Sequence, residues 1–97
     1  MQNVKRLEII TNTLEMREVR ATLEAEGVRG YTVIPRALGS GERGQQSGDD
    51  LSDAFSNALL LTACLPEDAP RLIEAVRPIL KKSGGVCLVS DAQWVIH

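Results

Sequence analysis

The sequence has few aromatic residues, little net charge and no long apolar run. Aromatic residues make up 3% of its 97 residues, so the core has to be built from aliphatic side chains. RNA-binding sheets need stacking aromatic residues and a basic surface, so this scarcity and the net charge of −2 argue against nucleic-acid binding. No stretch approaches the ~20 apolar residues of a membrane helix. The polar N-terminus lacks the apolar centre of a signal peptide, so we expect a cytoplasmic protein without membrane insertion.

Residues for catalysis and metal binding are equally scarce. The single histidine is His97, so no internal histidine can serve as a general base. The aspartates in residues 49–53 resemble solvating charges more than a catalytic pair, and we expect no enzyme. Cys64 and Cys87 lie far apart in apolar runs, which predicts reduced core thiols. We therefore expect neither a metal site nor a cofactor.

The apolar pattern predicts a strand, a helix and a strand, twice over. The first half has a strand at 7–11, a helix from about 14 to 26 and a strand from 30 towards 38. The second half has a strand at 57–65, a helix opening at 66–70 and ending at 83–85, and a strand at 86–90 that 93–96 continues. This order is typical of an α+β, ferredoxin-like βαββαβ fold with both helices on one face of the sheet. We expect one domain over residues 1–97, with another subunit covering the other sheet face.

Single residues indicate where these elements begin, end or bend. Asn12 can cap the first helix, with Glu15 as its capping-box partner, and Gly27 supplies the left-handed residue that ends it. Pro35 lacks a backbone donor, so its strand should lie at a sheet edge. Pro78 should kink the second helix or loosen its last turn.

A polar, glycine-rich segment separates the second and third strands. Residues 39–53 contain four glycines and one apolar residue, so we expect a mobile loop there. Its first six residues match G-x-G-x-x-G, but a dinucleotide fingerprint must open a helix, and residues 45–53 have no helical apolar stripe. Glycines allow a backbone to approach an anion closely, and Arg43 can pair with a phosphate or a small oxyanion. A surface loop without a ligand would have the same composition.

A second glycine pair, Gly84-Gly85, follows two lysines at the end of the second helix. In a ferredoxin-like fold this pair and the glycine-rich loop emerge from separate edges of the sheet. A ligand shared by the two would therefore lie between subunits. An ordinary helix cap explains the pair equally well.

Two stretches of the chain resemble the PII signalling proteins. Residues 16–33 resemble their first helix and second strand, and end in Gly27-Val28-Arg29-Gly30-Tyr31-Thr32-Val33 where the family has G-V-x-G-M/Y-T-V. Residues 39–43 resemble the G-x-G-R that opens their T-loop, with one residue inserted before the arginine. The order of strands, helices and glycines continues to residue 97, so the resemblance covers nearly the whole chain.

The resemblance implies a homotrimer that binds adenine nucleotides in the clefts between subunits. A flexible T-loop, at about residues 39–54, would change shape with the ligand and contact a protein partner. The residues implied at the nucleotide are Thr32, Gly39, Ser40, Gly41, Arg43, Gly44, Thr62, Gly84 and Gly85.

Departures from the family pattern affect which nucleotide we expect to bind. Val86 stands where the family has a phosphate-binding lysine, and the arginines after its last strand have no counterpart in residues 94–97. Fewer cations weaken the binding of a triphosphate, so we expect AMP or ADP to be favoured over ATP. The same losses favour the alternative of a trimeric interaction module that binds no nucleotide.

Residues 86–92 resemble the last strand of the PII-like subgroup associated with inorganic carbon uptake and carboxysomes. This resemblance implies bicarbonate as a second ligand, held by Arg43, Lys81 or Lys82. It also implies a bicarbonate transporter or a carboxysome component as the partner, and hence association with carboxysomes. Trp94 is expected to pack at a subunit interface, and stacking on a nucleotide base is the alternative.

Overall fold

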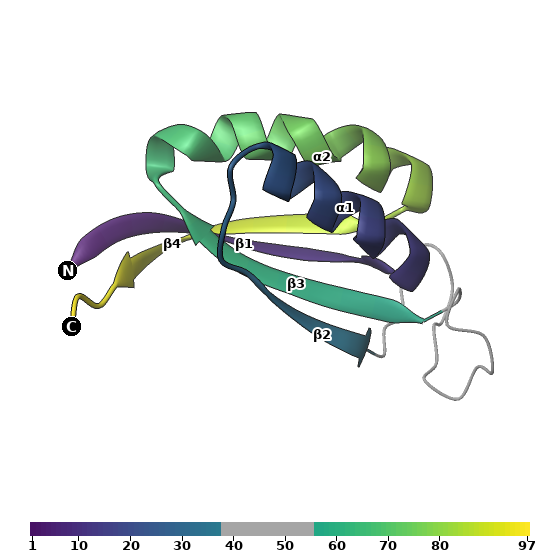
Figure 1. Ribbon diagram of the computed structural model, residues 1–97, viewed down its shortest axis with the longest axis horizontal. Helices are drawn as coiled ribbons and strands as arrows, with labels where there is room; N and C mark the ends of the chain where they lie inside the picture. The colour runs from purple at the N-terminus through teal and green to yellow at the C-terminus, as the bar shows by residue number, and fades with distance from the viewer. Residues whose placement is uncertain (38–55) are drawn as a thin grey trace.

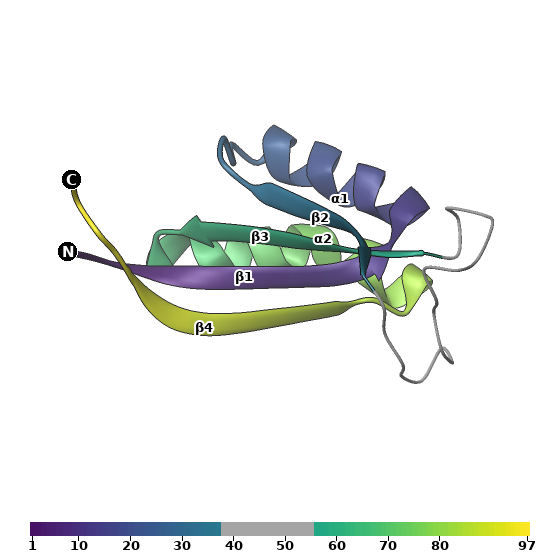
Figure 2. The same ribbon diagram turned by 90° about the horizontal axis from the view of Figure 1, so that it is seen from below.

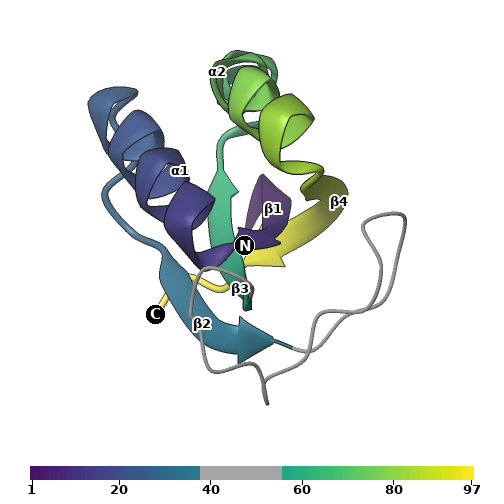
Figure 3. The same cartoon turned by 90° about the vertical axis from the view of Figure 1, so that its right-hand side faces the viewer.

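Two helices cover one face of a four-stranded antiparallel sheet (Figures 1 and 3). The computed structural model describes residues 1–37 and 56–97. The elements are β1 (Gln2–Asn12), α1 (Thr13–Ala25), β2 (Thr32–Ala37), β3 (Asn57–Cys64), a 3-10 helix η2 (Pro66–Asp68), α2 (Ala69–Ser83) and β4 (Val86–Trp94). This order confirms the predicted ferredoxin-like βαββαβ fold.

The strand order in the sheet is β2-β3-β1-β4, so β2 and β4 are its edges. All three pairings are antiparallel. As a result, β1 and β2 end on the side of the sheet where β3 and β4 begin. Both termini lie at the opposite end (Figure 1). The edge position predicted for the strand containing Pro35 is confirmed.

The core lies between the sheet and the helices and is aliphatic, as the composition predicts. Its fully buried members come from both layers: Leu7 and Ile9 of β1, Leu60 of β3, Val19 and Leu23 of α1, and Leu72 and Val76 of α2. On both helices the apolar residues recur three or four positions apart, which places them on one face. Neither of the described helices lies over the opposite face of the sheet (Figure 3).

The structure contains the predicted Asn12 cap and the left-handed Gly27, whereas Pro78 does not end α2. The Asn12 side chain accepts a hydrogen bond from the Glu15 amide at 2.8 Å, and Gly27 has a φ of 95°. Pro78 lies inside α2, and the helix continues through it to Ser83. The proline therefore removes one hydrogen-bond donor without ending the helix.

Strand β2 contains an irregularity close to its end. Ile34 pairs with Leu59 and Ala37 pairs with Asn57, so the β2 side has one residue more than the β3 side. Arg36, within this bulge, has a φ of 59°, which is rare for a residue with a side chain. Such a bulge bends an edge strand. Pairing resumes at Ala37, the last residue of β2, and the strand begins at Thr32, two residues after the predicted start at residue 30.

Candidate functional site

One face of the sheet lies opposite the helices (Figure 2), and its strands carry several exposed aliphatic side chains. Ile9 and Leu60 point into the core, and side chains alternate along a strand, so their neighbours point to the other side. We call this side the open face. Its aliphatic residues form two adjoining rows across the strands: Ile34, Leu59, Ile10 and Val86 in one, and Leu61 and Leu88 in the other. Within the described chain nothing packs over them, which is typical of a surface that binds another protein subunit.

A hollow of about 690 Å³ lies beside these rows, towards the chain termini. We call it the Trp94 hollow; its lining includes Val4, Arg6, Gly30, Thr32, Leu61 and Trp94. Trp94 is 56% exposed, so its indole face can stack on a planar ring. Arg6 is held by Glu8 at 2.8 Å and places a guanidinium group at the same surface. Of the residues predicted at the nucleotide, Thr32 lies here.

Thr62, another predicted site residue, also lines this hollow. It is buried, and its hydroxyl donates a hydrogen bond of 2.6 Å to the carbonyl oxygen of Gly30. This bond fixes the chain just before β2 begins. Thr62 therefore supports the hollow by positioning Gly30.

Gly84 and Gly85 form a tight turn at the other edge of the sheet, where α2 passes into β4. Gly84 has a φ of 72°, the left-handed conformation of a helix C-cap, and its N–H donates to the Leu80 carbonyl. The Gly85 N–H donates to the same carbonyl at 3.0 Å. Both amides are thus used within the chain, at the end of α2.

Gly85 is also required by packing. A Cβ at this position would lie 2.8 Å from the Ile10 carbonyl oxygen and 2.8 Å from Leu80 Cδ2. Ile10 belongs to β1, in the middle of the sheet, and its backbone cannot move aside. The glycine therefore allows the turn to lie directly against β1.

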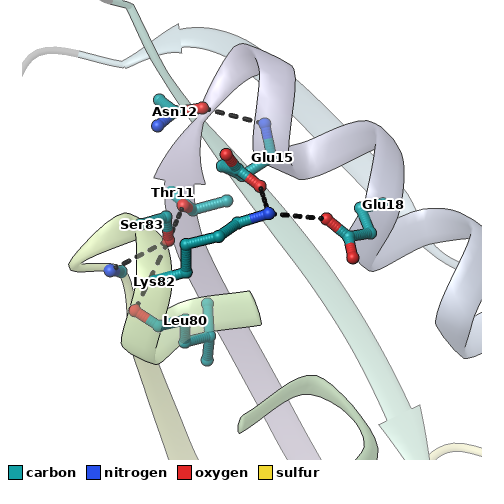
Figure 4. A network of polar contacts seen from close by, with 8 residues as sticks. Thr11, Asn12, Glu15, Glu18, Leu80, Lys82 and Ser83 are labelled. Carbon is teal, nitrogen blue, oxygen red and sulfur yellow. Dashed lines mark hydrogen bonds and ion pairs between the residues drawn. The ribbon is translucent and has the colours of Figure 1, made fainter. Parts of the chain in front are cut away.

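The two predicted anion-binding lysines differ in their surroundings. Lys82 Nζ lies 3.4 Å from a Glu15 carboxylate oxygen and 3.5 Å from one of Glu18 (Figure 4). The negative charges of Glu15 and Glu18 raise the pKa of Lys82. Lys81 is exposed and makes no hydrogen bond or ion pair with any residue the structure describes. With Arg77 and Gly85 it lines a second hollow, of about 460 Å³. Lys81 is therefore the lysine that can receive an anion.

The structure does not bring all the predicted site residues together within one chain. Thr32 starts edge strand β2 and Gly85 precedes edge strand β4, so three strand spacings of about 4.8 Å separate them. A single ligand could contact both regions only between two copies of the chain. Gly39, Ser40, Gly41, Arg43 and Gly44 lie outside the described residues. Arg6 was missed because the polar residues before Leu7 were not assigned to a strand.

Neither the two cysteines nor the described helices indicate a further functional site. Cys64 and Cys87 are free and partly buried against the core. Burial raises the pKa of both thiols, so they stay protonated at neutral pH. Residues 1–37 and 56–97 contain no cluster of His, Cys, Asp and Glu that could hold a metal ion. Neither helix described is long and apolar enough to cross a membrane.

Comparison with known proteins gives a consistent result. The family model of nitrogen regulatory protein P-II matches residues 4–96. CPII, a nitrogen regulatory PII-like protein from Thiomonas intermedia bound to ADP, AMP and bicarbonate, is 27% identical, with a TM-score of 0.87 over 95% of this chain and 88% of that one. Its complex with ADP and bicarbonate has the same identity and coverage and a TM-score of 0.84.

A PII-like signaling protein from Thermus thermophilus shares the fold at 22% identity, with a TM-score of 0.80 over 97% of this chain and 91% of that one. No curated protein matches the sequence.

Proposed function

The chain belongs to the nitrogen regulatory protein P-II family, and from this membership we propose that it is a homotrimeric regulator that binds ADP or AMP between its subunits. We propose that the segment at about residues 39–54 acts as its T-loop and contacts a protein partner in the cytoplasm. The observation that carries the proposal is the similarity over nearly the whole chain to CPII, which binds ADP, AMP and bicarbonate.

Two features of the structure support a nucleotide between subunits. The Trp94 hollow offers an aromatic face, a guanidinium group and the Thr32 hydroxyl, which suit a purine nucleotide. The Gly84–Gly85 turn lies at the opposite sheet edge, so a neighbouring copy can bring it to the hollow. The open face, with its two aliphatic rows, supplies a surface on which copies can assemble.

Calorimetric titration with AMP, ADP, ATP and cAMP tests this proposal. We expect ADP and AMP to bind and ATP to bind more weakly. A chain that binds none of the four would not be a nucleotide sensor. The alternative, a trimeric interaction module without a nucleotide, is favoured by the internal use of the Gly84 and Gly85 amides. Under this alternative, the chain captures its partner equally well with and without nucleotide, and the Arg43→Ala substitution does not change the capture.

The preference for AMP and ADP follows from Val86. This residue begins β4, is half exposed on the open face and carries no charge. We predict that Val86→Lys raises ATP affinity about tenfold relative to ADP, because an ammonium group in this place would pair with the added phosphate. Calorimetry with both nucleotides measures the ratio, and Val86→Met is the uncharged control. An unchanged ratio would mean that Val86 does not face the phosphates.

We propose bicarbonate as a second ligand and Lys81 as a contact for it. Lys81→Gln should weaken bicarbonate binding about threefold, the effect of one solvent-exposed ionic contact. Lys82→Gln makes the same change one residue away, but Lys82 is already paired with Glu15 and Glu18. It should leave bicarbonate binding unchanged and lower the melting temperature slightly. Titration of the ADP-loaded protein with bicarbonate separates the two, and equal losses would contradict the assignment.

Bicarbonate binding would connect the regulator to inorganic carbon metabolism. We propose a bicarbonate transporter or a carboxysome component as the partner, which would also place the protein at carboxysomes. Pull-downs in the presence of ADP, with and without bicarbonate, test this part. A partner that is captured equally well with and without ADP and bicarbonate would contradict it.

A further inference from the structure

Ser83 connects the end of α2 to the middle of the sheet (Figure 4). Its hydroxyl accepts a hydrogen bond of 2.7 Å from Thr11 Oγ1 and one of 3.2 Å from the Gly85 N–H, and donates towards the Leu80 carbonyl at 3.5 Å. A serine hydroxyl has one donor and two acceptor positions, and all three are used here. The side chain therefore bridges the sheet and the glycine turn.

Thr11 gives this bridge a fixed anchor. It lies on the helix side of β1, 0% exposed, and its backbone pairs with Ala58 of β3. Its branched side chain has few rotamers, so the position of its hydroxyl is well defined. Leaving a buried hydroxyl without a hydrogen-bond partner costs free energy. Thr11 and Ser83 therefore stay paired.

Besides this side-chain bridge, the turn is held by the Gly84 and Gly85 N–H bonds to the Leu80 carbonyl and by the packing of Gly85 against β1. Glycine has the greatest backbone freedom of any residue, and this turn contains two in succession. The Gly85 N–H donates two hydrogen bonds, one to the Leu80 carbonyl and one to the Ser83 hydroxyl. The ion pairs of Lys82 hold the same helix end against α1 but do not touch the glycines.

We propose that Ser83, held by Thr11, is a positioning residue for the nucleotide: it fixes the Gly84–Gly85 turn in the shape that receives ADP. The inference rests on the proposed function and adds residues to the site that the resemblance does not supply. Ser83 need not touch ADP. A turn that is ordered before binding loses less conformational entropy when the ligand arrives, and this gain appears as affinity.

The test measures ADP affinity by calorimetry for Ser83→Ala, Thr11→Val and the double variant. Each single change should weaken ADP binding about fivefold to tenfold, the effect of one hydrogen bond. The double variant should bind no more weakly than Ser83→Ala, because the two residues act as one unit. Ser83→Thr keeps the hydroxyl and should restore parental affinity.

Two further measurements separate positioning from general stability. Hydrogen exchange of the Gly85 amide should be faster in Ser83→Ala and Thr11→Val, and parental in Ser83→Thr. Val76→Ala, in the buried centre of α2, is the control that lowers stability without touching the turn. It should bind ADP with parental affinity.

The outcomes distinguish this inference from the proposed function. A parent protein that binds no adenine nucleotide overturns both. A parent that binds ADP, with Ser83→Ala and Thr11→Val binding equally well, overturns the positioning role alone. If Val76→Ala weakens ADP binding by as much, the positioning role is overturned as well, because the loss of affinity would then result from the loss of stability.

Discussion

Leu88→Glu should convert the proposed trimer into monomers. Leu88 is 54% exposed on the open face and pairs across the sheet with Glu8 of β1. The substitution would place two carboxylates opposite each other in a surface that assembly removes from water. A buried charge without a partner costs about 3–5 kcal/mol, which corresponds to more than a hundredfold weaker association. Size-exclusion chromatography with light scattering measures the change in mass.

Leu14 provides a matched control for this experiment. It is 56% exposed, close to the value for Leu88, but lies in the first turn of α1, in the helical layer. Leu14→Glu makes the same chemical change, and a carboxylate is favoured near a helix N-terminus. This variant should keep the parental mass. If Leu88→Glu also keeps it, the subunits do not meet through the open face.

The order of the elements was predictable because each one obeys a local rule. Helical spacing of apolar residues, the Asn12 cap and the Gly27 stop depend on neighbours within a few positions along the chain. The extent of β1 was not predictable in this way. Residues 2–6 are mostly polar, and residues 2–4 pair only with β4. Val4 is the one buried residue among them, and a single buried position leaves no apolar alternation in the sequence.

The candidate site was predictable where the sequence resembles a family motif or carries a glycine pattern. The resemblance implies Thr32 and Thr62, and the glycine pair at 84–85 is also visible in the sequence itself. The pairing of Thr11 with Ser83 joins residues 72 positions apart, and two common hydroxyl residues carry no signal for it. Arg6 and Trp94 line the same hollow because of the strand register, which depends on the fold as a whole. Long-range polar contacts of this kind have to be read from the structure.

Gly85→Ala should destabilise the fold by about 2–3 kcal/mol, the usual cost of forcing a methyl group into a filled space. The added Cβ would meet a backbone oxygen of β1 and a side-chain carbon of α2, each at 2.8 Å. The Leu80 side chain can rotate, but the Ile10 carbonyl is fixed by the sheet. The turn would have to move away from β1, and the Thr11–Ser83 bridge would have to stretch. Urea unfolding without nucleotide measures the loss.

Gly30→Ala is the matched control for this substitution. Its Cβ would have no atom within 4 Å, and its backbone does not have a positive φ. The free energy of unfolding should therefore stay within about 0.5 kcal/mol of the parental value. A glycine pair beside a ligand site would ordinarily be attributed to the ligand alone. If Gly85→Ala were as stable as Gly30→Ala and only ADP binding fell, the packing explanation would be wrong and the ligand would account for the glycine.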